Sequence, residues 1–244
     1  MKEITSVNNP LIKELIKLKQ KKYRDKEKKF IVEGYNIIEE AKDYITLIIT
    51  SSKEDENILP NVEHILVPKE IIGKLSETVT PQGIIGICNY VTSRENFEGN
   101  VLVLDGLQDP GNIGTLIRTA ICFDFNTIYI TDNSCDIYNE KVLRATQGGI
   151  LKVNIIRKNI NDIIDDLKKK GYYIVGTSLK NGIPLNDINF KNLNAIILGN
   201  EGNGVSKEIC DLKLNNLYIP MQNMESLNVG VAGSILMYEI SKIK

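Results

Sequence analysis

Three short polar segments in the second half of this 244-residue chain combine residue types that could bind a ligand and transfer a group. They read DPGNIGTLIRTA, LGNEGNGVS and IPMQNMESLNVGVAGS, at residues 109–120, 198–206 and 219–234. Each joins an apolar, β-branched run typical of a strand to a turn rich in Gly, Asn or Pro and then to a helical pattern. We therefore expect polar groups at the carboxyl edge of an α/β sheet, where ligands of such sheets bind.

The first segment predicts the start of a helix, and Arg118 does not lie on the face of that helix that we expect to be buried. Asn112 stands where we expect the N-cap. At about 100° per residue, Arg118 points away from the centre of the apolar stripe and is available to a ligand or a partner subunit. An ordinary exposed helix arginine would fit the same position. The stripe consists of Ile113, Leu116, Ile117, Ala120 and Ile121.

The second segment contains three closely spaced glycines, Gly199, Gly202 and Gly204. Glycines in a turn allow the backbone to approach a ligand or to adopt positive φ. Their spacing, G-x-x-G-x-G, reverses the dinucleotide fingerprint, so NAD binding is poorly supported. Glu201 could accept hydrogen bonds from a ligand, from Arg118 or from backbone amides, or could be an exposed turn glutamate.

The third segment predicts a strand that ends at Pro220, a polar turn through Ser226, Leu227 and Asn228, and then a helix. Small residues along this helix would let it pack closely against other backbone. They are Gly230, Ala232, Gly233 and Ser234, and the apolar positions are Val229, Ala232, Leu236 and Ile240.

The elements around these segments alternate regularly. Strands are expected at residues 101–105, 127–130, 152–156, 173–177, 195–198 and 217–219, mostly separated by helical segments. This order predicts a mostly parallel sheet with helices on both faces.

The N-terminal part predicts a smaller α/β unit. Helices are expected from Asn9-Pro10 and at residues 35–42 and 69–75, and strands at residues 30–34, 46–50, 64–67 and 83–91. The polar stretch 92–100 reads as a linker. We therefore expect two domains, at residues 1–92 and 101–244.

Composition excludes several classes of protein. With 42% hydrophobic and 25% charged residues, no run approaches the roughly 18 apolar residues of a membrane span, and no leader pattern is present, so we expect a cytoplasmic protein. The four cysteines are isolated and His64 is the one histidine, which argues against zinc, a disulfide framework and imidazole catalysis. We expect reduced, mostly buried thiols and no metal.

Charge is unevenly distributed along the chain. Residues 1–29 hold ten Lys and Arg against four acids, a net +6, whereas the rest carries 20 against 27, a net −7. Such a basic arm could bind a polyanion such as RNA. A solvated helix face would give the same pattern.

Together, the motifs N-x-G-x-x-x-R-T-A (residues 112–120), G-N-E-G-x-G (199–204) and I-P-M…S-L-N-V (219–229) resemble the three signature motifs of the SpoU/TrmH family of RNA 2′-O-ribose methyltransferases, in the SPOUT superfamily. The resemblance covers about residues 101–244. FIVEG (30–34) and TPQGI (80–84) resemble the substrate-binding extension of members that act on ribosomal RNA. Ile113, where Leu is commoner, and Gly230, where Ser or Ala often stands, are small departures.

The resemblance implies methyl transfer from S-adenosylmethionine to a ribose 2′-hydroxyl, a trefoil knot near the C-terminus and a homodimer. The implied RNA is 23S ribosomal RNA, with transfer RNA as the alternative. A non-catalytic RNA-binding protein and a nucleotide- or NAD-dependent enzyme are rival readings; the latter needs a glycine fingerprint or P-loop that the sequence lacks. By position, the implied catalytic residues are Asn112, Arg118, Glu201, Ser226 and Asn228, and the implied cofactor-binding residues are Thr177, Leu198, Gly199, Ile219, Met221 and Leu227.

Overall fold

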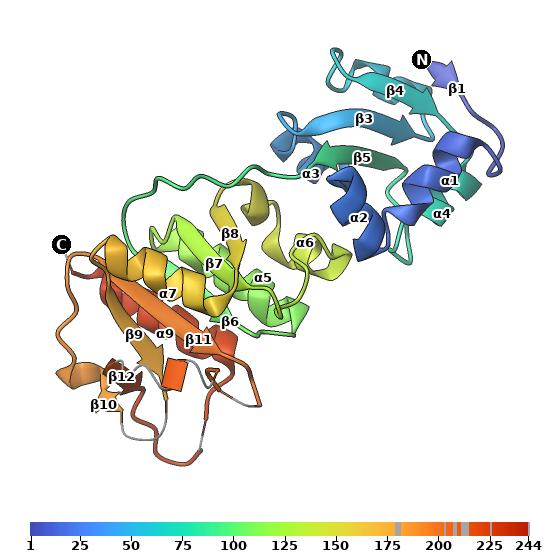
Figure 1. The fold of residues 1–244 in the computed structure, drawn as a ribbon. Helices are drawn as coiled ribbons and strands as arrows, with labels where there is room; N and C mark the ends of the chain where they lie inside the picture. Colours follow the sequence, from blue (N-terminus) through green and yellow to red (C-terminus); the bar gives the residue numbers. More distant parts are fainter. Residues whose placement is uncertain (179–181, 203, 207–208, 211–214, 225, 244) are drawn as a thin grey trace. The chain divides into compact units, whose positions relative to one another are not determined.

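The computed structural model describes residues 1–178, 182–202, 204–206, 209–210, 215–224 and 226–243. The chain forms two compact units (Figure 1). The first contains Met1–Thr92 and Tyr138–Leu151, and the second contains Ser93–Ile137 and Lys152–Lys244. A stretch inside the sequence of the second unit therefore folds as part of the first.

The first unit is built on a mixed five-stranded sheet with the order β1-β4-β3-β5-β2. β1, β4 and β3 are parallel, and β5 runs antiparallel to both β3 and β2. The strands are β1 (Lys2–Glu3), β2 (Lys29–Glu33), β3 (Ile45–Thr50), β4 (Glu63–Leu66) and β5 (Ile84–Asn89). The helices are α1 (Pro10–Lys17), α2 (Lys21–Glu27), α3 (Tyr35–Glu40), α4 (Lys69–Leu75) and α6 (Glu140–Thr146), with 3-10 turns at Lys53–Asn57 and Gly149–Leu151.

The basic arm of residues 1–29 is folded into this unit. Asn9 caps α1 by accepting from the Leu11 amide, as Asn9-Pro10 led us to expect, and α1 buries Ile12 and Leu15 in the core. Arg24 of α2 is itself buried, and its guanidinium donates to the carbonyl of Leu18 at 2.8 Å. The lysines of this arm thus belong to the surface of a folded domain.

Residues 138–151 join the first unit through aromatic packing. The Tyr138 ring lies 3.9 Å from that of Tyr90, stacked, and 4.6 Å from that of Phe30. Its hydroxyl also accepts from the Val91 amide at 2.9 Å. Residues 138–151 therefore complete the hydrophobic core beside β2.

The second unit is a seven-stranded, fully parallel sheet with the order β10-β12-β9-β11-β6-β7-β8. Its strands are β6 (Val101–Asp105), β7 (Thr127–Thr131), β8 (Asn154–Lys158), β9 (Tyr173–Thr177), β10 (Ile183–Pro184), β11 (Asn194–Gly199) and β12 (Asn215–Tyr218). The helices are α5 (Pro110–Cys122), α7 (Ile160–Lys169) and α9 (Val229–Ser241), with a 3-10 turn at Leu185–Asp187. The expected parallel α/β architecture is confirmed.

Helices cover both faces of this sheet (Figure 1). Val101 and Ile197 pack with Ile163 of α7 in one core cluster. Leu198, the neighbour of Ile197, points to the opposite face, where it lies against α9.

Two local expectations were wrong. The strand expected at residues 152–156 begins at Asn154, because a 3-10 turn at Gly149–Leu151 precedes it and the Asn154 side chain bonds to the backbone of Arg94 at 2.7 and 2.8 Å. The thiols are free but not mostly buried, since Cys122 and Cys210 are exposed.

The same Gly→Ala substitution should have opposite effects at two helical sites. A Cβ at Gly233 of α9 would lie 2.4 Å from Leu116 Cδ2 and 2.5 Å from Leu198 Cδ1, both on buried side chains, whereas at Gly73 of α4 it would meet nothing within 4 Å. We expect Gly233→Ala to lower the free energy of unfolding by about 1–3 kcal/mol, because the added methyl group overpacks the core. Gly73→Ala should raise the free energy of unfolding by about 0.5–1 kcal/mol, because alanine has less backbone freedom than glycine in the unfolded chain. Calorimetric melting of both variants checks this; shifts of equal sign would contradict it.

Candidate functional site

Helix α5 starts at the edge of the sheet, and the residue that caps it is not Asn112. Asp109, not Asn112, is the N-cap: its carboxylate accepts from the Asn112 amide at 2.8 Å, and Pro110 occupies the first helical position. The expectation for Asn112 was wrong because Asp is a strong N-cap and Pro is favoured immediately after one. The Asn112 side chain is therefore available for tertiary contacts.

Those contacts join the three polar segments. The Asn112 amide nitrogen donates to Glu201 Oε1 at 2.9 Å, and its oxygen accepts from Asn228 Nδ2 at 2.9 Å. Because a carboxylate at Glu201 can only accept, the direction of both bonds is set. Asn228 also caps α9, since its oxygen accepts from the amide of Gly230 at 2.9 Å. Side chains 89 and 116 positions from Asn112 thus meet on it.

The glycine-rich segment folds back on itself beside this cluster. Asn200 pairs with Gly204 through two backbone hydrogen bonds of 2.8 and 2.9 Å. A Cβ at Gly199 would lie 2.1 Å from the amide nitrogen of Val205, so no other residue fits there. The Ser206 amide donates to the buried Asp105 carboxylate at 2.7 Å and fixes the end of the loop. Asn203 lies outside the described residues.

The residues expected to bind the cofactor follow three adjacent parallel strands. Thr177 ends β9, Leu198 and Gly199 end β11, and Ile219 follows β12; β9 lies between the other two strands. The Thr177 hydroxyl donates to the Ile197 carbonyl across this edge at 3.0 Å. Met221 and Leu227 continue into the segment that leads to α9, in which Glu225 lies outside the described residues. The structure therefore brings the strand-borne members of this set to one edge.

Arg118 and Ser226 stand apart from the hydrogen-bonded cluster. Both are exposed, and no bond joins the Arg118 guanidinium or the Ser226 hydroxyl to another residue within the described ranges. Six positions along a helix turn a side chain by about 600°, so Arg118 and Asn112 project roughly 120° apart. Glu201 pairs with Asn112, a partner that the sequence had not indicated.

Sequence reasoning also missed several residues that support the site. Asn200 donates to the Gly106 carbonyl at 2.9 Å and accepts from the Gly202 amide at 3.0 Å. The hydroxyls of Thr119 and Ser234 lie 3.0 Å apart and link α5 to α9. The available signals were weak: an asparagine between glycines, and hydroxyls facing inward on two helices.

Over the described residues, no helix has the length and apolar character needed to cross a membrane. In that same part of the chain, His, Cys, Asp and Glu side chains form no group of three or more that could hold a metal ion.

Comparison with known proteins relates both parts of the chain to known families. Residues 99–238 match the SpoU rRNA Methylase family, and residues 9–86 match the MRM3-like substrate binding domain. The 23S rRNA (guanosine(2553)-2′-O)-methyltransferase RlmP of Bacillus subtilis (strain 168) is 35% identical over 246 residues, covering 98% of this chain and 99% of its own.

Solved structures of similar fold cover nearly the whole chain. The AdoMet-bound rRNA methyltransferase from Sinorhizobium meliloti has a TM-score of 0.89 and 27% identity, covering 99% of this chain and 97% of its own. A structure described as an RNA 2′-O ribose methyltransferase has a TM-score of 0.79 and 26% identity, with 98% of each chain covered.

The direction of the Asn112 bonds can be tested by reversing it. Asn228→Asp keeps the cap of α9 but replaces the donor that faces Asn112 by an acceptor. Asn112 then faces two acceptors, and the free energy of unfolding should fall by about 1 kcal/mol. Adding Glu201→Gln supplies a donor, so the Asn112 amide can turn and satisfy both neighbours. We expect the double variant to recover about 0.5 kcal/mol or more in a denaturation cycle. Strictly additive effects would contradict the reversal, and Asn228→Ala, which loses the cap as well, is the control.

Proposed function

This chain belongs to the SpoU family of RNA methyltransferases, and we propose that it methylates a ribose 2′-hydroxyl of 23S ribosomal RNA. The enzyme is an S-adenosylmethionine-dependent RNA 2′-O-ribose methyltransferase. The 23S assignment is supported by the RlmP relative, which aligns over almost the full length of both chains, and by the match to an MRM3-like substrate binding domain. The observation that carries the proposal is the meeting of the three motifs in the bonds of Asn112 with Glu201 and Asn228. Transfer RNA is the alternative substrate.

The edge formed by β12, β9 and β11 fits S-adenosylmethionine, which supplies the methyl group when bound. Glycine at position 199 lets the chain fold back tightly on the end of β11, because a Cβ there would lie 2.1 Å from the Val205 amide nitrogen. We assign the adenosine and methionine parts to backbone groups and apolar side chains of this edge. The residues concerned are Thr177, Leu198, Gly199, Ile219, Met221 and Leu227.

We assign the orientation of the ribose to the polar residues of the three segments. Arg118 is a poor proton acceptor, because a guanidinium carries five N–H donors and no acceptor. In our proposal the guanidinium binds the adjacent RNA phosphate through two hydrogen bonds and thereby orients the 2′-hydroxyl, while a phosphate oxygen or water takes the proton. Asn112, Ser226 and Asn228 fix the ribose, and Glu201 holds Asn112.

The two parts of the chain then have separate tasks. We assign residues 1–92, with their basic arm and with Tyr138–Leu151 as part of the same unit, to binding of the RNA, and the rest of residues 101–244 to a knotted methyltransferase domain. The trefoil knot is proposed from the match of residues 99–238 to the SpoU rRNA Methylase family. A ribosomal RNA substrate also implies action in the cytoplasm.

A homodimer is the proposed assembly. Helix α9 exposes Val231 and Tyr238, each 49% exposed, and Leu227 just before the helix is 37% exposed. Large apolar side chains gathered along one helix favour a partner surface. In this arrangement α9 of one protomer packs on its copy.

Cells that lack this protein should lose one 2′-O-methyl group from 23S ribosomal RNA. The measurement is mass spectrometry of nuclease digests of ribosomal and transfer RNA from cells with and without the gene. Restoration by wild-type protein and not by Asn112→Ala assigns the loss to this site. A loss confined to transfer RNA would favour the alternative substrate, and unchanged RNA would contradict the proposal.

Substitutions at Arg118 separate a phosphate clamp from a diffuse charge. Arg118→Lys keeps the charge but loses the planar fork, and Arg118→Met loses both. For a clamp, both variants should slow single-turnover methyl transfer at saturating cofactor by about a hundredfold or more. Calorimetry should show unchanged cofactor binding in each. If Arg118→Lys transfers methyl groups at nearly the wild-type rate and Arg118→Met does not, the phosphate clamp is contradicted and Arg118 acts only through its positive charge.

A further inference from the structure

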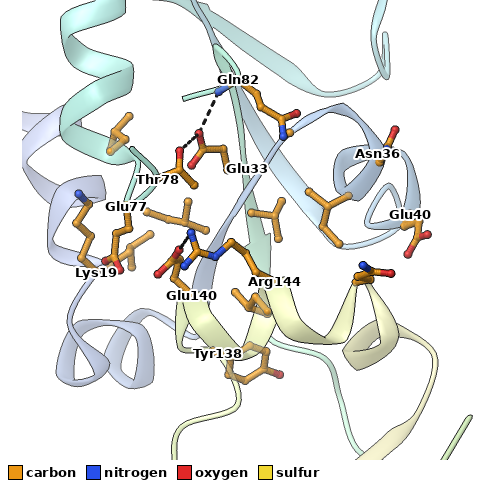
Figure 2. Close-up of a pocket in the computed structure, with 18 of the residues that line it drawn as sticks. Lys19, Glu33, Asn36, Glu40, Glu77, Thr78, Gln82, Tyr138, Glu140 and Arg144 are labelled. Carbon is orange, nitrogen blue, oxygen red and sulfur yellow. Dashed lines mark hydrogen bonds and ion pairs between the residues drawn. The ribbon is translucent and has the colours of Figure 1, made fainter. Parts of the chain in front are cut away.

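The first unit contains a pocket of about 510 Å³ that the methyl-transfer chemistry does not use (Figure 2). Its lining comes from the end of α1, from β2 and α3, from the loop before β5 and from α6. The volume falls within the range of small-ligand sites, about 300–1,000 Å³. Aliphatic side chains, among them the buried Leu18, Leu75 and Leu143, provide the apolar part of the wall.

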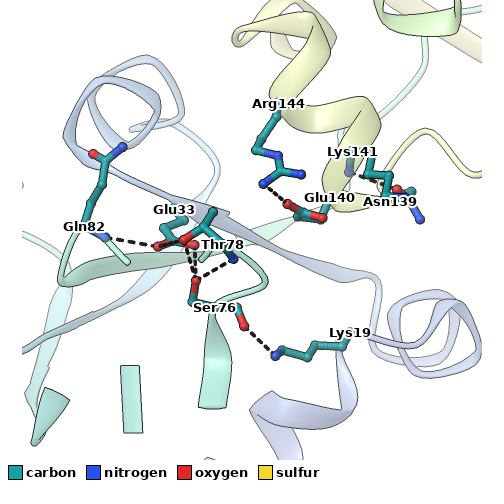
Figure 3. Close-up of polar contacts among 9 residues, drawn as sticks. All are labelled: Lys19, Glu33, Ser76, Thr78, Gln82, Asn139, Glu140, Lys141 and Arg144. Carbon is teal, nitrogen blue, oxygen red and sulfur yellow. Dashed lines mark hydrogen bonds and ion pairs between the residues drawn. The ribbon is translucent and has the colours of Figure 1, made fainter. Parts of the chain in front are cut away.

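One of the acids in the wall is already satisfied. The Glu33 carboxylate accepts from Ser76 Oγ at 2.6 Å, from Thr78 Oγ1 at 3.0 Å and from the Gln82 amide at 3.2 Å (Figure 3). Three donors hold it in place, so Glu33 ties the loop before β5 to β2. Its role is to build the wall.

Glu77 and Glu140 differ from Glu33, because their carboxyls lie beside one another at the pocket and Arg144 pairs with Glu140. Glu140 pairs with Arg144 at 2.6 Å, and the three side chains lie next to one another in Figure 2. Burial raises the pKa of Glu140, and the nearby Glu77 carboxyl, which is hydrogen-bonded to it, adds to the shift while Arg144 opposes it. The other two cations of the lining are bound to backbone: Lys19 donates to the Ser76 carbonyl at 2.6 Å, and Arg24 donates to the carbonyls of Leu18 and Lys19 at 2.8 and 2.7 Å. A hydrogen bond between two carboxyls needs a proton on one of them, and a ligand that brings N–H donors would replace that proton and let both carboxylates accept.

The lining therefore calls for a flat molecule with adjacent donors on one edge and acceptors on another. Guanine has N1–H and the N2 amino group side by side, which a carboxylate can accept together, and O6 and N7, which a guanidinium can donate to. Adenine and cytosine offer one amino group each, and uracil offers a single N–H. Among the four bases, guanine alone presents two adjacent donors to a carboxylate together with two adjacent acceptors to a guanidinium such as that of Arg144.

We propose that this pocket binds a guanine base of the RNA substrate. The inference rests on the proposed function in one respect, that RNA is the substrate. The same unit carries the basic arm, and two cations of that arm, Lys19 and Arg24, line the pocket, where positive charge favours the phosphates of a polyanion. The phosphates stay outside with the lysines, and the uncharged base enters the pocket.

Binding of free nucleosides tests the chemistry of the pocket directly. Full-length protein with methyl-labelled leucine is saturated with S-adenosylhomocysteine, which occupies the cofactor site, and titrated with guanosine, inosine, 7-deazaguanosine or adenosine. Guanosine should shift the methyl signals of Leu18, Leu75 and Leu143. Inosine, which lacks the N2 amino group, should bind about fivefold more weakly, and Glu77→Gln or Glu140→Gln should weaken guanosine at least about tenfold. Glu39→Gln, an exposed glutamate of α3 outside the pocket, is the matched control.

Equal binding of guanosine and inosine, or wild-type affinity in both pocket variants, overturns the proposal. Saturation of the same signals by magnesium or guanidinium ions, with guanosine inert, overturns it in favour of a cation site. Melting temperatures close to wild type show that the variants are folded.

Methyl transfer to 23S ribosomal RNA from cells lacking the protein tests the assignment to RNA. Glu77→Gln should raise KM with little change in kcat, because the pocket binds substrate away from the reacting atoms. An unchanged KM in a variant that has lost guanosine binding overturns the role in substrate recognition. Absence of methyl transfer by the wild-type protein counts against the proposed function. The guanosine titration still decides whether the pocket binds guanine.

Discussion

The side-chain amide of Asn112 is the group on which the polar edge of the second unit depends. An amide donates and accepts at once, so it can bond to a carboxylate on one side and to another amide on the other. Here it donates to Glu201 and accepts from Asn228, and Asn228 in turn caps α9. A loop, a helix start and a second helix start thereby share one short chain of hydrogen bonds. Neither Asp nor Leu at position 112 could satisfy both neighbours.

That chain of bonds requires backbones to come very close. Gly233 lets α9 approach both Leu116 of α5 and Leu198 of β11, and Gly199 leaves room for the loop that returns over it. The small residues noted in the sequence therefore have a common cause in packing. Without them the two helix starts would stand too far apart for side chains as short as Asn112 and Asn228 to meet.

Local patterns predicted most elements because their causes are local. The apolar run VLVLD gives β6 with the expected bounds, and Asn9-Pro10 gives the start of α1. α2 was indicated only as the alternative of a solvated helix face, since its sequence KKYRDKE has no apolar stripe and its one buried side chain is that of Arg24. In the site, sequence indicated which residues have useful chemistry. It could not indicate that Glu201 pairs with Asn112, because a separation of 89 positions leaves no periodic signal.

The insertion of Tyr138–Leu151 into the first unit makes that unit discontinuous along the chain. A ribosome that has released only the first 92 residues has produced a core in which Phe30 still lacks the ring of Tyr138. The first unit can be completed only after residue 151 has emerged, by which time β6, α5 and β7 of the second unit have already been made. The N-terminal unit therefore receives its last segment only after part of the second unit has been synthesised.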